Sequence, residues 1–140
     1  MTQVFFYHGA ADKLAAACAL ISGAYAKGKA LQIYAPEKSL ADSVDRALWA
    51  QAQLSFIPHC RADSPLATET PIVIAEHAEQ LNPGERLLNL GLDIPTAFQQ
   101  FNSLIEVVGQ DEAERDAGRE RVRHYRAAGC DVRFYDLSQR

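Results

Sequence analysis

Strand-like and helix-like segments alternate along this 140-residue chain from its first residues onward. β-rich runs at 3–7 and 30–34 are followed by helical patterns at 11–27 and 40–51. A strand, a helix and a second strand in this order form the crossover unit of a parallel sheet. The order therefore predicts an α/β fold in which helices cover a mostly parallel sheet.

The second half of the chain continues the alternation less regularly. We expect further strands at 72–75, 86–90, 104–108 and 132–137, and helices at 95–101 and 111–128. The run at 55–58 is compatible with another short strand, whereas the turn-forming residues of 60–71 predict a surface loop. Because no repeat or linker interrupts the pattern, we expect a single three-layer α/β domain over residues 1–140.

Arginine is concentrated at the C-terminal end of an acidic chain. The formal net charge is -4, yet seven of the 14 Lys and Arg residues lie within 111–140. At helical pitch, Arg115, Arg119, Val122 and Arg126 fall on one stripe of the expected helix, because residues three and four apart share a face. The stripe predicts a local binding site for an anion, while the overall charge argues against a general nucleic-acid binder.

The arginine stripe has a second interpretation, which is a solvated helix face balanced by Asp116 and Glu120. Against it, neither acid lies on the stripe, and Val122 places an apolar side chain among the charges. Arginines around a small apolar recess suit an acidic, apolar peptide that ends in a carboxylate, because guanidinium groups pair carboxylates bidentately. DNA phosphate is the competing anion.

An aromatic cluster lies on and just after the second expected helix. Trp49, the chain's only tryptophan, lies near the end of that helix, and Phe56 and Pro58 come shortly after it. One interpretation is that the aromatic side chains fill the core. The other is an interface anchor, because a Trp at a helix end next to a loop is typical of protein contacts.

Signals for catalysis and for cofactor binding are weak. The first strand–helix turn, 7–13, has one glycine and neither of the glycine patterns that wrap phosphates, so we expect Lys13 to be a solvated charge. His8 ends the first strand and is the best enzymatic candidate, but no catalytic motif accompanies it. The histidines and cysteines have no metal-ligand spacing. We therefore expect no catalytic residues, no cofactor and no metal.

The chain also lacks membrane and export signals. No apolar run approaches the roughly 20 residues that cross a bilayer. The N-terminus lacks the basic region and cleavage site of a signal peptide. We expect a cytoplasmic protein without membrane association.

Three segments together resemble the chi subunit of bacterial DNA polymerase III holoenzyme. They are VFFY at 4–7, DRALWA at 45–50 with SFIPH at 55–59, and RERVRHYRAAG at 119–129. The resemblance covers nearly the whole chain in order. It implies a Rossmann-like α/β fold without a nucleotide-binding loop, in a non-catalytic accessory subunit of the clamp-loader complex, with nucleotidyltransferase activity residing in another subunit.

The resemblance also implies two partners. Chi-like proteins bind the psi subunit, which tethers them to the clamp loader, and the acidic C-terminal tail of single-stranded DNA-binding protein, which ends in Pro-Phe. Association with single-stranded DNA is then indirect. By position, Trp49 and Phe56 match aromatic residues of the psi-facing surface, and Pro58 is predicted to belong to the same surface.

The tail site is carried over onto the arginine stripe. The predicted tail-binding residues are Val108, Arg115, Arg119, Val122, Tyr125, Arg126 and Gly129. Val122 stands where the family pattern has a tyrosine. Either the pocket is shallower in this chain, or Tyr125 and His124 supply its aromatic wall. The alternative function is a direct single-stranded nucleic-acid-binding module that uses the same arginine-rich helix.

Overall fold

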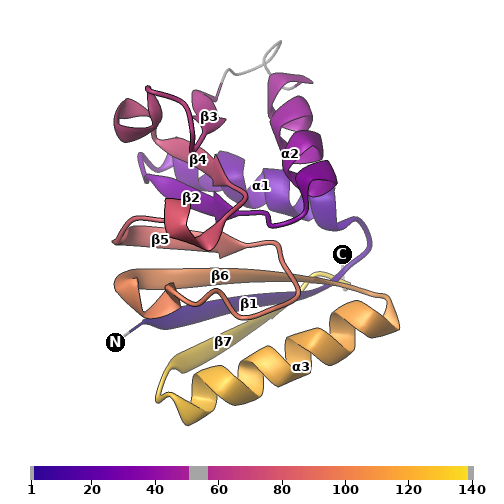
Figure 1. The fold of residues 1–140 in the computed structure, drawn as a ribbon. Coiled ribbons are helices and arrows are strands. Elements are labelled where there is room, and N and C mark those ends of the chain that lie inside the picture. Colours follow the sequence, from indigo (N-terminus) through magenta and orange to yellow (C-terminus); the bar gives the residue numbers. More distant parts are fainter. Residues whose placement is uncertain (1, 51–56, 139–140) are drawn as a thin grey trace.

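The computed structural model describes residues 2–50 and 57–138, in which helices cover both faces of a central sheet (Figure 1). The strands are β1 (Gln3–Ala10), β2 (Leu31–Tyr34), β3 (His59–Arg61), β4 (Ile72–Ala75), β5 (Gly84–Asn89), β6 (Phe101–Gly109) and β7 (Asp131–Asp136). The helices are α1 (Lys13–Ala26), α2 (Lys38–Ala50) and α3 (Glu112–Ala127), with short 3-10 turns η2 (Ala67–Glu69), η3 (Ala78–Gln80) and η4 (Phe98–Gln100).

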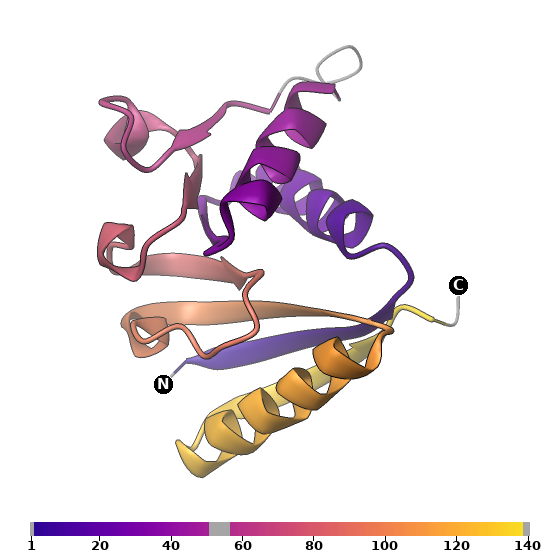
Figure 2. The same ribbon diagram turned by 45° about the vertical axis from the view of Figure 1, so that its right-hand side comes forward.

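The sheet has the strand order β3-β4-β2-β5-β6-β1-β7, and every strand pair in it is parallel. Figures 1 and 2 show α1 and α2 on one side of the sheet and α3 on the other. The connection from β6 through α3 to β7 passes over β1, which lies between those two strands. The predicted three-layer α/β fold with a mostly parallel sheet is confirmed.

Helix α3 forms where its sequence signals place it. The Asp111 side chain accepts a hydrogen bond from the Glu114 backbone N–H at 2.8 Å and so caps the first turn. After the helix, Gly129 adopts a φ of 86°, a conformation that side chains disfavour. The expected helix at 111–128 is therefore confirmed to within one residue at each end.

Two expectations for the middle of the chain are wrong. The segment 60–71 is not a loop throughout, because it contains most of β3 and the turn η2. Pairing of His59 with Ile72 draws this turn-rich segment into the edge of the sheet. The expected helix at 95–101 is only η4, since Phe101 already begins β6.

Of the strand proposed at 55–58, residues 55 and 56 lie outside the described part, while 57 and 58 are not in a strand.

A buried polar cluster fixes α3 on the sheet. The Glu106 carboxylate of β6 accepts hydrogen bonds from Arg121 Nε at 3.1 Å, from Asn89 Nδ2 at 3.1 and 3.2 Å, and from the Tyr125 hydroxyl. These four side chains are at most 2% exposed. Burial raises the pKa of the Glu106 carboxyl, while its three donors favour the ionised form. Burial and Glu106 also raise the pKa of Tyr125, which keeps its hydroxyl as a donor.

Removing the Tyr125 hydroxyl tests this cluster. We expect Tyr125→Phe to lower the free energy of unfolding by about 1–3 kcal/mol, because a buried carboxylate loses one donor. Urea denaturation measures the loss. The control is Tyr25→Phe on α1, a residue that is 37% exposed, and its change should stay within about 0.5 kcal/mol. Equal losses in the two variants would contradict a special role for the buried cluster.

Candidate functional site

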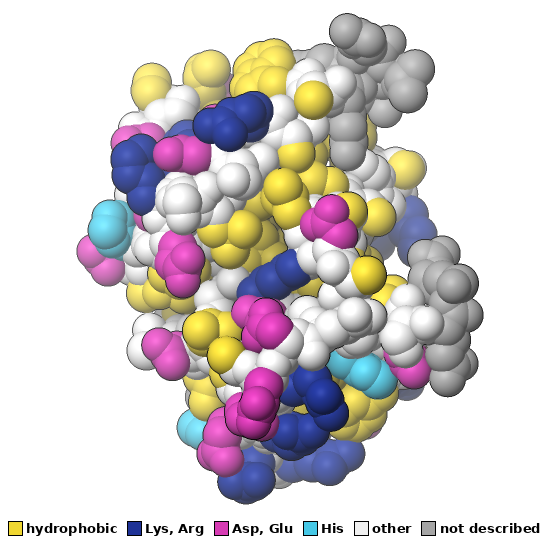
Figure 3. Space-filling view, turned by 90° about the vertical axis from the view of Figure 1, so that its right-hand side faces the viewer, with side chains coloured by type: hydrophobic (Ala, Val, Ile, Leu, Met, Phe, Trp, Pro, Cys, Tyr) yellow, Lys and Arg dark blue, Asp and Glu magenta, His cyan; other side chains and the backbone are white. Residues whose placement is uncertain are grey.

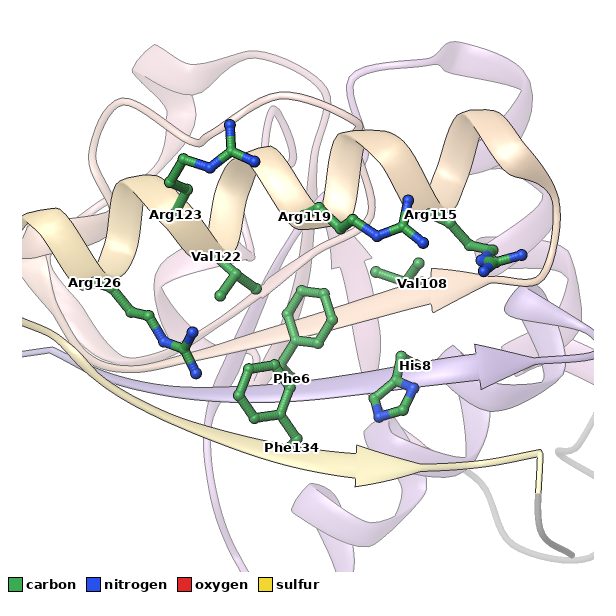
Figure 4. A pocket seen from close by; sticks show the side chains of 9 residues that line it. All are labelled: Phe6, His8, Val108, Arg115, Arg119, Val122, Arg123, Arg126 and Phe134. Atoms are coloured by element: carbon green, nitrogen blue, oxygen red, sulfur yellow. The ribbon is translucent and has the colours of Figure 1, made fainter.

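A groove of about 510 Å³ lies between α3 and strands β6, β1 and β7 (Figure 4). Its floor is apolar and its rim is basic. The floor residues are Phe6, Val108, Val122 and Phe134, and the rim residues are His8, Arg115, Arg119, Arg123 and Arg126. The structure thus brings together five of the seven residues predicted for the tail site, which are Val108, Arg115, Arg119, Val122 and Arg126.

Strand pairing builds the aromatic floor. Phe6 of β1 is in register with Phe134 of β7, and residues in register on parallel strands point to the same face. Their ring centroids lie 5.5 Å apart in an edge-on arrangement. Phe6 is almost fully buried, whereas Phe134 remains 46% exposed. The floor therefore offers an open aromatic surface to an apolar side chain.

Helix α3 approaches this floor closely at Gly118. A Cβ there would lie 3.1 Å from Phe6 Cζ and 3.1 Å from Val108 Cγ2, which is tighter than ordinary van der Waals contact. Glycine costs helix stability relative to alanine, so its position here reflects the close approach. The close approach places α3 directly against Phe6 and Val108, which belong to the groove floor.

The rim arginines differ in their surroundings. Arg126 lies over the Phe134 ring, with its guanidinium carbon 5.3 Å from the centroid. Arg119 donates to Asp116 at 2.8 Å across one turn, so the expectation that no acid balances the stripe is wrong for this residue. Among residues 2–50 and 57–138, no carboxylate is paired with Arg115 or Arg126.

The pairing of Arg119 with Asp116 does not remove its capacity to bind an anion. Its side chain is 59% exposed, and surface pairs of this kind contribute only about 0–1 kcal/mol. Arg123 pairs with Glu120, and its guanidinium points away from the floor in Figure 4. Figure 3 shows basic side chains gathered on the lower part of the molecule beside hydrophobic side chains and a histidine. The groove can hold an apolar side chain and an adjacent carboxylate together.

Two predicted site residues do not line the groove. Tyr125 is fully buried on the side of α3 that faces the sheet, where its hydroxyl donates to Glu106. Its predicted place in the aromatic wall is therefore wrong. His124 is exposed and contacts the Phe98 ring instead, at 5.9 Å between centroids. Gly129 ends the helix outside the groove. The aromatic side chains of the groove are instead Phe6 and Phe134 of its floor, which lie on strands, so no pattern along the helix could reveal them.

Trp49 forms a second candidate surface on α2. Its side chain is 56% exposed, so the interpretation that it fills the core is wrong. The indole meets the His59 ring edge-on at 5.1 Å, and His59 Nε2 is 2.8 Å from Asp45 Oδ1. Pro58 is half-buried nearby in sequence, and Phe56 lies outside the described residues. An exposed Trp supported by a fixed imidazole suits an interface anchor.

Arg61 of β3 pairs with the carboxylates that lie near Trp49. Its guanidinium donates to Asp42 at 3.1 Å and to Glu76 at 2.7 Å, and also reaches Asp45. These pairs connect α2 to the edge of the sheet. They also lower the pKa of the Asp42 carboxyl, chiefly through the hydrogen bond from Arg61. The end of α2 that carries Trp49 is thereby held in place before any partner binds.

A salt bridge lies at the first strand–helix turn, the position where many α/β proteins bind phosphate. Lys13 at the start of α1 donates to Glu114 at 3.1 Å and to the Leu90 carbonyl at 2.9 Å. Glu114 also accepts from the Gly109 backbone N–H at 3.1 Å. The prediction that Lys13 is a solvated charge is wrong, because it links α1 to α3 at the carboxyl ends of the strands.

Other kinds of site find little support among the described residues. Within 2–50 and 57–138, no three His, Cys, Asp or Glu side chains are grouped to hold a metal ion. In the same part of the chain, no helix is both long enough and apolar enough to cross a bilayer. Cys18 and Cys130 are buried free thiols, and burial raises the pKa of both, which disfavours the reactive thiolate.

Comparison with known proteins gives one consistent result. Residues 1–133 match the family described as "DNA polymerase III chi subunit, HolC". The chain is 30% identical to DNA polymerase III subunit chi of Pseudomonas aeruginosa, with 98% of both proteins covered. It is 29% identical to the protein of the same name from Haemophilus influenzae, covering 83% of this chain and 81% of the relative. The corresponding Escherichia coli protein is 26% identical, with 82% and 79% covered.

Replacing Lys13 tests whether it has a structural role at the closed turn. We expect Lys13→Met to lower the free energy of unfolding by about 1–3 kcal/mol, because Glu114 and the Leu90 carbonyl lose a charged donor. Chemical denaturation measures the change. Lys27→Met at the exposed end of α1 is the control and should change stability by less than about 0.5 kcal/mol. An unchanged stability in Lys13→Met would contradict a structural role for this lysine.

Proposed function

The chain belongs to the family of DNA polymerase III chi subunits, and from this membership we propose that it links the clamp loader to single-stranded DNA-binding protein. The family places it as an accessory subunit in DNA replication. In the proposed role it is non-catalytic and binds two partners. One is psi, and the other is the acidic C-terminal tail of single-stranded DNA-binding protein.

The groove beside α3 is the proposed tail site. The observation that carries this proposal is the combination of an aromatic floor with arginines on one rim. The tail's terminal Phe enters the recess between Val122, Val108 and the two strand phenylalanines. Its carboxylate replaces Asp116 as the partner of Arg119, at little cost because the Arg119–Asp116 pair is exposed.

Electrostatics favour an acidic tail over other apolar peptides. The chain as a whole is acidic, so the guanidinium groups around the groove create a local positive field on a negative molecule. Such a field speeds the encounter with an acidic peptide and repels basic ones. Because a short peptide buries little area, its affinity should be roughly micromolar, or about -8 kcal/mol, and should weaken with salt.

The Trp49 surface is the proposed contact with psi. It lies on α2 next to β3, at one edge of the sheet, whereas the groove lies beside β7 at the opposite edge and on the opposite face. The two surfaces therefore do not overlap. This separation supports a bridging role, because both partners can be bound at the same time.

The tail proposal is tested with a labelled acidic peptide that ends in Pro-Phe. We expect Arg119→Ala to weaken binding by roughly 10-fold or more, because a charge-assisted hydrogen bond to the terminal carboxylate is lost. Fluorescence anisotropy measures the affinity. Arg123→Ala is the matched control, since it removes one arginine of the same helix whose guanidinium points away from the floor. Equal affinities of wild type and Arg119→Ala would exclude this site.

The alternative function makes a different prediction in the same assay. A direct nucleic-acid binder should bind bare single-stranded DNA at least as tightly as the peptide. We expect the isolated protein to bind such DNA weakly, because only Phe134 of the groove floor offers an open ring for base stacking.

The psi proposal is tested with Trp49→Ala. We expect this variant to lose co-purification with psi, because the exposed indole is the anchor of that surface. Binding of the tail peptide and the melting temperature should stay close to wild type. A variant that retains psi would contradict the assignment, and so would one that loses psi only because it unfolds.

A further inference from the structure

The groove continues beyond its aromatic floor. Past His8 and Arg115 it opens into a second hollow of about 310 Å³, which shares those two residues and Val108 with the groove. The remaining lining residues of this hollow are Gly9, Gly109, Gln110 and Ser138. The continuation lies where β1 and β6 end and α3 begins. A peptide that fills the recess therefore has a path in this direction.

The other end of the groove is less open to a peptide. There Arg126 lies across the Phe134 ring, with 5.3 Å between the guanidinium carbon and the ring centroid. Arg126 thus stands over part of the floor at the end that lies toward the C-terminus of α3. An extended peptide that leaves the recess thus runs toward Arg115.

His8 is placed to contact such a peptide. It is half-buried, and its ring lies 6.2 Å from the Phe6 ring and 6.3 Å from the Phe134 ring, both measured between centroids. Figure 4 shows the imidazole on β1, on the side of the groove opposite α3. Among the described residues, neither ring nitrogen takes part in a hydrogen bond. Arg115 faces the same space from the helix and has no carboxylate partner in that part of the chain.

We infer that His8 and Arg115 together bind a side-chain carboxylate of the acidic peptide, at a position separate from the terminal carboxylate at Arg119. This inference rests on the proposed tail site and deepens it. The imidazole N–H and the guanidinium are both donors, and a carboxylate accepts from two donors at once. His8 thus gives the groove a selectivity for acidic residues that the arginine stripe alone does not provide.

The spacing of the two positions fits an extended peptide. Arg115 and Arg119 are one turn apart, about 6 Å along the helix axis. An extended chain rises about 3.3 Å per residue, so this distance corresponds to roughly two residues of peptide. The acid bound by His8 and Arg115 should therefore lie about two or three residues before the peptide's C-terminus.

A neighbouring carboxylate disfavours a ligand with more than one negative charge at this position. Asp136 of β7 is in register with His8, and among the described residues it is the carboxylate beside that histidine on the adjacent strand. Ser138 donates to the Asp136 carboxylate from its hydroxyl at 2.6 Å and from its backbone N–H at 2.9 Å, and these bonds lower the pKa of Asp136. Asp136 therefore stays ionised, and it disfavours a doubly charged group such as phosphate more strongly than a carboxylate.

Peptide and protein variants together test the inference. The probes are the acidic peptide ending in Pro-Phe and versions in which each acidic residue in turn becomes its amide. With wild type, we expect one substitution, two or three residues before the terminus, to weaken binding roughly three- to tenfold. His8→Leu should weaken binding of the acidic peptide by a similar factor. This variant should bind the acidic peptide and the version with that residue changed to its amide equally well. His8→Gln, which keeps an N–H donor, should retain part of the discrimination.

The control is His124→Leu, which removes an imidazole from the same region outside the groove and should change nothing. Arg115→Ala combined with His8→Leu should cost less than the sum of the single changes, because both residues contact the same carboxylate. If His8→Leu discriminates as well as wild type while Arg119→Ala still loses binding, the His8 assignment is overturned and the tail site stands. If wild type binds no peptide, both fall.

Discussion

The buried ion pair between Glu106 of β6 and Arg121 of α3 determines how the third helix lies on the sheet. Removing two charges from water costs several kcal/mol per ion, and their attraction offsets this only when further hydrogen bonds complete the geometry. Asn89 and Tyr125 supply those bonds to Glu106, and Arg121 also donates to the Leu92 carbonyl at 2.7 Å. Apolar packing tolerates small rotations of a helix, whereas these directional hydrogen bonds form in only one rotation and one axial position of α3.

The groove depends on that fixed rotation. Residues three and four apart share a helix face, so burying Arg121 and Tyr125 turns the neighbouring stripe of Arg115, Arg119 and Arg126 toward β7. The same placement holds Gly118 against Phe6 and leaves Val122 at the edge of the recess. The arginine-rich helix thus has two functions that its composition does not distinguish. One arginine holds the helix on the core, and the others face solvent and the candidate ligand.

Local signals made part of this structure predictable. The bounds of α3 follow from the Asp111 cap and Gly129, and the arginine stripe follows from helical pitch. The groove floor was not predictable, because Phe6 and Phe134 are 128 residues apart and meet only through the pairing of β1 with β7. Arg121 and Lys13 were missed for the same reason. Their partners are distant in sequence, so nothing local separates a buried or paired cation from a solvated one.

The arrangement of the two candidate surfaces also explains how a weak contact with the peptide can be enough for recruitment in the proposed role. The Trp49 surface and the groove lie at opposite edges of one continuous sheet, so a partner at one surface does not cover the other. In the proposed role, a partner bound at Trp49 tethers the chain to a larger assembly. A tether converts the second binding event into one governed by effective concentration, which adds avidity without any new contact. A groove with roughly micromolar affinity then holds its peptide long enough to recruit the protein that carries it. The groove still releases the peptide readily, because exposed arginines exchange partners at little cost.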